Sequence, residues 1–238
     1  MEIKTDALLL RAVNYGENDK MVTLFTADRG KIGAAVKGVR KATAKLRFAA
    51  QPFCFAEYVL AERSGRYTVT SASLYDGFYP LREDIGAFYA ATAVCEACDA
   101  LMYEGMVNGG LFVSAVTALK EMCEGGVSAA LIRFLVRALS LAGYPVSAEE
   151  SCPACGEPLC GRMRFDFSSG SFFCDRCGVG EPASESTYQT VRSALGAECK
   201  GSLLGADGEK RALRLLNAYY SVKTENTLPA LGEYIRMI

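Results

Sequence analysis

The stretch KMVTLFTADRGKIGAAVK, residues 20–37, decides the fold of the first third of this 238-residue chain. Residues 20–27 and 31–37 are typical of short strands, and Asp28-Arg29-Gly30 between them has the composition of a turn. In the second strand the two-residue period places apolar residues on one face and lysines on the other. These residues are Ile32, Ala34 and Val36 on the first face, and Lys31 and Lys37 on the second.

Three further segments of residues 1–80 have the same character. A strand is predicted at 7–13, before a polar loop, and two more at 53–62 and 67–75, joined by Arg63-Ser64-Gly65-Arg66. Five short strands separated by turn signals are typical of a small barrel. We therefore expect residues 1–80 to form an OB-fold, a five-stranded barrel that often binds nucleic acids.

The pattern changes to helices after Pro80. Apolar residues recur at helical spacing in several segments, and Gly143 followed by Pro145 is a suitable helix end. The predicted helices cover about 84–104, 109–124, 128–142, 186–195 and 208–222. The expected class is α+β, with a helical domain at 81–238 interrupted at about 150–180 by a cysteine-rich segment.

Four cysteines in that segment have the spacing C-x2-C-x18-C-x2-C. The residues are Cys152, Cys155, Cys174 and Cys177. Two residues between the cysteines of a pair allow both sulfurs to reach one ion, and four thiolates form the closed shell of a structural zinc site. Residues 164–173 between the pairs resemble a hairpin turning at Ser168-Ser169-Gly170, which predicts a zinc ribbon with one Zn²⁺ per chain.

Two alternatives for this motif are four packed thiols without metal and an iron–sulfur cluster. The neighbouring Cys160 is treated as a non-ligand. Cys95 and Cys98 also form a C-x2-C pair, but they lie within a predicted helix on an apolar stripe, which favours core packing over redox chemistry.

Positive charge is concentrated near the start of the chain, although the net charge is only −1. Residues 29–47 contain seven basic side chains and no acidic one, which favours a DNA-binding face over a solvated loop. The predicted DNA contacts are Arg29, Lys31, Lys37, Arg40, Lys41, Lys45 and Arg47. The candidate aromatic platforms for bases are Tyr15, Phe25, Phe48, Phe53, Tyr58 and Tyr67.

The chain resembles the bacterial RecO family of recombination mediators across nearly its whole length. The resemblance rests on the combination of several loose motifs in a common order. They are ALLLR at 7–11, YGE at 15–17, TLFT at 23–26, VKGVRK at 36–41, QPF at 51–53, and FLVRALSLAGYP at 134–145 leading to Cys152.

The resemblance implies an N-terminal OB-fold, a helical domain and an embedded zinc element. It also implies binding of single- and double-stranded DNA, annealing of complementary strands, and loading of RecA, together with RecR, onto DNA coated by single-strand-binding protein. By the same analogy the acidic tail of single-strand-binding protein docks on the helical domain. Arg133 and Arg137, one turn apart, are the candidate contacts, with a solvated helix face as the alternative.

Other function classes fit the sequence less well. The chain has no histidine, which excludes the usual hydrolase triads, and it shows neither the P-loop motif of nucleotide kinases nor the H-x-E of zinc deaminases. A zinc-ribbon adaptor that binds only protein stays open, as does a zinc-scaffolded nucleotide enzyme. With no signal-peptide pattern and no apolar run of about 20 residues, we expect a cytoplasmic, nucleoid-associated protein without membrane contact.

Overall fold

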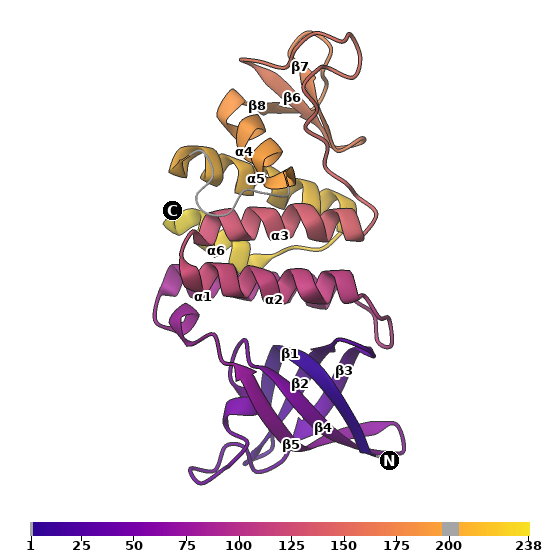
Figure 1. Ribbon diagram of the computed structural model, residues 1–238, viewed down its shortest axis with the longest axis vertical. Coiled ribbons are helices and arrows are strands. Elements are labelled where there is room, and N and C mark those ends of the chain that lie inside the picture. The colour runs from indigo at the N-terminus through magenta and orange to yellow at the C-terminus, as the bar shows by residue number, and fades with distance from the viewer. Residues whose placement is uncertain (1, 197–204) are drawn as a thin grey trace. The chain divides into compact units, whose positions relative to one another are not determined.

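The computed structural model describes residues 2–196 and 205–238, which form two compact units, residues 1–123 and 124–238. The first unit contains a barrel and two helices, and the second contains helices and a small sheet (Figure 1). The change from strands to helices falls near residue 80. The division into domains at that residue stays a prediction.

A closed five-stranded barrel opens the first unit. Its strands are β1 (Glu2–Tyr15), β2 (Asp19–Thr26), β3 (Gly30–Val36), β4 (Phe55–Arg63) and β5 (Arg66–Asp76). They pair in the order β1-β2-β3-β5-β4, and β3 and β5 are parallel where every other pair is antiparallel. The predicted five-stranded barrel is confirmed, and a helical region follows it as expected.

Strand β1 closes the barrel because its two halves pair with different strands. Glu2–Leu8 pairs with β4 and Ala7–Tyr15 pairs with β2, and a bulge lies between Leu9 and Arg11. A bulge shifts the alternation of faces, so side chains remain directed into the barrel on both sides of it. The barrel interior is filled by aliphatic residues, including Ile3, Leu9, Val22, Leu24, Ile32, Val36 and Leu60.

Two helices of the first unit cover part of the outer wall of the barrel. They are α1 (Ile85–Leu101) and α2 (Gly109–Glu124), which follow the short η2 turn (Tyr79–Arg82). Phe25 alternates with the inward-facing Leu24 and so lies on the outer wall, yet it is fully buried. Its ring packs edge-on against Phe112 of α2 with centroids 5.4 Å apart.

Within its described residues, the second unit combines four helices with a three-stranded sheet. The helices are α3 (Val127–Leu141), α4 (Glu185–Leu195), α5 (Ala206–Thr224) and α6 (Pro229–Met237), and α3, α4 and α5 pack on one another. The sheet has the order β7-β6-β8, with β6 (Met163–Asp166), β7 (Ser171–Cys174) and β8 (Glu181–Ala183). The predicted hairpin is therefore β6–β7, and the third strand, β8, was not predicted because three residues carry too little alternation.

The tip of the β6–β7 hairpin is fixed to helix α5. Gly170 has φ +69°, and a Cβ on it would lie 2.5 Å from the backbone oxygen of Pro145 and 2.5 Å from the hydroxyl of Tyr219. Lys223 Nζ donates to the backbone oxygen of Ser168 at 2.9 Å. These contacts hold the tip of the hairpin against the helices. The cysteines lie at the opposite end of the hairpin.

Candidate functional site

The four cysteines of the double C-x2-C motif converge at one end of the small sheet. Their sulfur atoms all lie within 4.8 Å of one another, and Cys155 Sγ and Cys174 Sγ are 3.8 Å apart. Sulfurs about 2.3 Å from a tetrahedral Zn²⁺ are separated by about 3.8 Å, so this spacing fits one ion. The cluster could therefore hold a metal ion with four sulfur ligands.

Two glycines allow the chain to turn after each cysteine pair, for different reasons. Gly156 has φ +75°, and its N–H donates to the Cys152 carbonyl at 2.9 Å. Gly178 donates to the Cys174 carbonyl at 2.9 Å, and a Cβ there would lie 2.7 Å from Arg164 Cβ. The first turn needs glycine for its backbone conformation and the second needs it for space.

The thiols of the cluster differ in acidity. Burial alone would raise the pKa of Cys152, but backbone N–H donors, including that of Cys174, outweigh it and lower the pKa to about 6. The pKa of Cys177 is raised to about 12, first by side-chain hydrogen bonds with Cys155 and Cys174. Hydrogen bonds to the thiols of Cys155 and Cys177 raise the pKa of Arg176. A metal ion binding here must displace protons from the thiols, because the thiolate is the ligand.

The other cysteines of the described chain lie outside this cluster. Cys160 is exposed and is not one of the four clustered thiols. Cys95 and Cys98 are buried in α1, and burial raises the pKa of Cys95 to about 12 and that of Cys98 well above its ordinary value. A buried thiol with a raised pKa is a poor nucleophile. This environment agrees with the interpretation of Cys95 and Cys98 as packing residues.

Five of the predicted DNA contacts lie on one segment, residues 37–47, which we call the basic loop. It follows β3 and leads into the η1 turn (Phe48–Ala50). Its side chains Lys37, Arg40, Lys41, Lys45 and Arg47 are all exposed. Segments this polar cannot be held by burial alone, so other contacts must fix the loop.

The basic loop is held by the connection between β1 and β2. Gly38 N donates to Asp19 Oδ1 at 2.7 Å, and Arg40 N donates to the Asn18 carbonyl at 2.9 Å. The Arg40 guanidinium also donates from Nη1 to the Gly16 carbonyl at 3.1 Å. Val39 is buried in the barrel core. These bonds fix the start of the loop while leaving its charges in solvent.

Arg29 and Lys31 are not brought together with the basic loop. Arg29 precedes β3 and the loop follows it, so the length of a seven-residue strand, roughly 23 Å, separates them. Lys31 Nζ forms an ion pair with Asp99 Oδ1 at 2.9 Å, and Arg29 Nε lies 3.6 Å from Asp28 Oδ2. A cavity of about 610 Å³ adjoins this end of the barrel, and acidic residues Asp28 and Glu104 are among its lining.

Most of the candidate aromatic platforms belong to the core. Phe25, Phe53 and Tyr58 are buried, and Phe48 and Tyr67 pack against the barrel core. Tyr15 is the exception among the six, with 62% of its surface exposed. Sequence patterns do not separate these residues because an aromatic ring in a strand suits either face.

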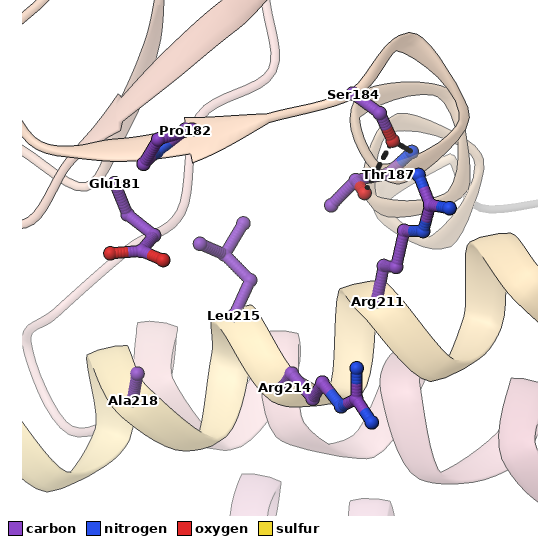
Figure 2. Close-up of a pocket in the computed structure, with 8 residues that line it drawn as sticks. All are labelled: Glu181, Pro182, Ser184, Thr187, Arg211, Arg214, Leu215 and Ala218. Atoms are coloured by element: carbon purple, nitrogen blue, oxygen red, sulfur yellow. Dashed lines mark hydrogen bonds between the residues drawn. The ribbon is translucent and has the colours of Figure 1, made fainter.

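The candidate tail contacts lie on α3 in the second unit. Arg137 is exposed and Arg133 is half-buried. A separate pocket of about 250 Å³ lies between β8, the start of α4 and α5 (Figure 2). Arg211 and Arg214 of α5 line it together with Glu181, and Arg211 pairs with Asp207 at 2.9 Å. The sequence analysis did not identify these two arginines, because the pocket depends on how α5 packs against β8.

Across residues 2–196 and 205–238, no helix combines the length and apolar character that crossing a membrane requires.

Comparisons with known proteins identify the same family in both parts of the chain. The family model described as recombination protein O N terminal matches residues 1–78, and the model described as recombination protein O C terminal matches residues 82–232.

Curated relatives are of similar length. A DNA repair protein RecO of Anaeromyxobacter sp. (strain K) is 33% identical over 214 residues, 88% of this chain and 84% of the relative. That of Alkaliphilus metalliredigens is 31% identical over 238 residues, 99% of this chain and 93% of the relative. That of Myxococcus xanthus is 32% identical over 220 residues, covering 90% and 89%. The chain therefore belongs to the recombination protein O family of DNA repair proteins, whose members are recombination mediators and not enzymes.

Proposed function

We propose that this chain binds single- and double-stranded DNA through its barrel, anneals complementary strands and, with RecR, loads RecA onto DNA coated by single-strand-binding protein. The observation that carries the proposal is the basic loop, with five exposed cations on a segment fixed to the barrel by hydrogen bonds from Gly38 and Arg40. Proteins that contact phosphates release condensed counterions, and this release drives binding that does not depend on sequence.

Annealing follows from the same charges. Two complementary strands repel each other through their phosphates, and a surface that neutralises phosphates lowers that repulsion while leaving bases free to pair. No nucleotide hydrolysis is required. The place of action proposed with this function is the cytoplasm, at the nucleoid.

The metal proposed for the four-thiol cluster is one structural Zn²⁺. All four donors are thiolates, the chain has no histidine, and a closed tetrahedron leaves no position for a reacting water. Bound zinc would fix the ends of β6 and β7 relative to one another. In this proposal the zinc site has a structural role, and DNA binding is the role of the barrel.

Replacing Arg40, Lys41, Lys45 and Arg47 with alanine tests the DNA-binding proposal. We expect weaker binding of single- and double-stranded DNA, and a logarithmic salt dependence whose slope falls by roughly 0.7–0.9 for each phosphate that is no longer neutralised. A matched comparison sets Arg40→Ala with Lys41→Ala against Lys4→Ala with Lys120→Ala, which removes the same charge from exposed sites of the same unit. Equal decreases of affinity in the two double variants would contradict the assignment to the basic loop.

An annealing assay separates the mediator from the two alternatives. The wild-type chain should accelerate annealing of complementary oligonucleotides without ATP, and RecR should alter the rate on DNA coated by single-strand-binding protein. A protein-only adaptor would show no DNA affinity, and a nucleotide enzyme would require a nucleotide.

A further inference from the structure

Three aromatic side chains on the barrel and the turn after it are largely exposed: Tyr15, Tyr75 and Tyr79. Tyr75 donates to Asp6 at 2.8 Å and its ring lies 5.0 Å from that of Phe55. The ring of Tyr79 lies 5.1 Å from the Arg82 guanidinium. Within the described residues, the Tyr15 side chain makes no hydrogen bond and its ring meets no other ring or cation. Of these three described tyrosines, Tyr15 is the one whose ring has no such partner.

Tyr15 lies at the end of an open strip of the barrel wall. It shares the outer face of β1 with Arg11 and Val13, by the two-residue period, and both are exposed. Strand β2 and, beyond it, β3 continue this face, and of the four residues concerned only Met21 has a long side chain. Register places Met21 opposite Val13 and Thr23 opposite Arg11, then Ala35 opposite Met21 and Gly33 opposite Thr23.

The wall is low at the Arg11 end of this strip, four residues from Tyr15. Gly33 is exposed, and a Cβ on it would meet no atom within 4 Å. Phe112 of α2 packs against the buried Phe25 lower on this wall, whereas Val13 has 48% of its surface exposed. A flexible single strand can lie against such a strip, because its bases can turn toward the surface.

The basic loop directly adjoins Tyr15. The carbonyl of Gly16, the next residue, accepts a hydrogen bond from the Arg40 guanidinium at 3.1 Å, and Asp19, opposite Tyr15 in the ladder, accepts from Gly38 N. Arg11 supplies a further exposed cation on the strip itself, and Glu17 is the exposed acidic residue of the β1–β2 connection. A strand whose phosphates contact the loop therefore has bases close to Tyr15.

We propose that Tyr15 is a stacking platform for an unpaired base, and that it makes the barrel favour single-stranded over double-stranded DNA. The inference rests on the proposed DNA-binding function and adds a residue and a selectivity to it. In a duplex both faces of each interior base are already stacked, so Tyr15 has no interior base to receive. In a single strand the base is free, and stacking on an aromatic ring is tolerant of sequence because every base has a flat face.

Substitution of Tyr15 separates stacking from charge. Tyr15→Ala should weaken binding of an oligo(dT) by roughly ten-fold, as expected when one base–aromatic stack is removed. Binding of a duplex of the same length should change by less than about two-fold, because phosphate contacts are unaltered. Tyr15→Phe, which keeps the ring, should bind oligo(dT) as the wild type does. The alanine variant of the basic loop should instead bind both forms more weakly.

A tryptophan provides a direct readout because the chain contains none. The fluorescence of Tyr15→Trp should be quenched by oligo(dT), with saturation at the concentrations that saturate binding. Tyr75→Trp, beside Asp6 and Glu57, is the matched control and should remain unquenched.

The outcomes distinguish the two proposals. Two results would overturn the stacking role alone, provided that the wild type binds DNA. One is a Tyr15→Trp fluorescence that oligo(dT) does not quench, and the other is equal weakening of single-stranded and duplex binding in Tyr15→Ala. Absence of DNA binding in the wild type overturns the proposed function itself, and the stacking role with it.

Discussion

Lys31 of β3 forms an ion pair and a hydrogen bond with a single residue, Asp99, in the last turn of α1. Its Nζ lies 2.9 Å from the Asp99 carboxylate and 2.6 Å from the Asp99 backbone oxygen. A cation at this position also interacts favourably with the carboxyl end of the helix. The ion pair connects the outer wall of the barrel to α1. It also neutralises the charge of Lys31, which was one of the predicted DNA contacts.

Lys31→Met should therefore reduce stability more than DNA affinity. We expect the free energy of unfolding to fall by about 1–2 kcal/mol, since the pair is partly buried and includes a charged hydrogen bond. Urea denaturation measures this decrease, and Lys120→Met on the exposed face of α2 is the control. A decrease of DNA affinity equal to that of Arg40→Ala, without a decrease of stability, would show instead that Lys31 contacts DNA.

Zinc should bind at one equivalent per chain, and its binding should depend on the four clustered thiols. Cys174→Ser should lose the metal, while Cys160→Ser should retain it, because Cys160 lies outside the cluster. Structural zinc sites contribute roughly 10–16 kcal/mol of apparent binding energy to local folding. Chelation should therefore increase hydrogen exchange in β6–β8 and leave the barrel strands protected. Less than about half an equivalent of zinc in purified protein, or the presence of iron, would contradict this assignment.

Gly170→Ala should destabilise the second unit more than Gly161→Ala does. Both glycines have nearly the same backbone conformation, with φ +69° and +68°, so both variants carry a similar conformational strain of roughly 1 kcal/mol. Of these two positions, only Gly170 would place the new Cβ against Pro145 and Tyr219, which adds about 1–3 kcal/mol of overpacking. Thermal or chemical denaturation of both variants measures the difference. Equal destabilisation would mean that the hairpin tip is not packed against α5 in solution.

Asp166 should stabilise the β6–β7 turn at neutral pH. Hydrogen bonds from the Ser168 side chain and backbone, and then from Ser169, lower the pKa of Asp166 to about 2. Because the pKa is lower in the folded chain, this contribution is present above about pH 4 and is lost as the pH falls toward 2. Asp166→Asn should cost about 1 kcal/mol after solvent screening, equally at pH 7 and pH 5. A cost that changes between those two values would implicate another titrating group.

Charge reversal on α3 tests the proposed contact with single-strand-binding protein. Arg133→Glu with Arg137→Glu should weaken binding of a synthetic peptide of the acidic tail by at least about ten-fold, since attraction becomes repulsion. Arg211→Glu with Arg214→Glu, in the pocket of Figure 2, changes the charge of the same unit equally and is the control. If the control fails to bind the peptide and the α3 variant retains it, the tail binds at α5 and the α3 assignment is wrong.

Local patterns were sufficient for much of this molecule. The alternation within residues 20–37 predicted two strands of the barrel, because a strand with one buried face must repeat every two residues. The spacing of the cysteine pairs likewise predicted the sulfur cluster, since two intervening residues bring both thiols of a pair to one point.

Only the tertiary structure decided which of the predicted functional residues can act together. Alternation places Phe25 and Lys31 on the outer wall of the barrel without indicating what covers that wall, and Tyr15 lay beyond the end of the predicted strand 7–13, whereas β1 extends to it. Packing of α1 and α2 buries Phe25 and pairs Lys31 with Asp99, whereas Tyr15 stays open beside the basic loop. The sequence by itself determined the barrel, the thiol cluster and the charges. Contacts between residues far apart in the chain determine which charged side chains and aromatic rings are exposed together on one surface. No local sequence pattern records those contacts.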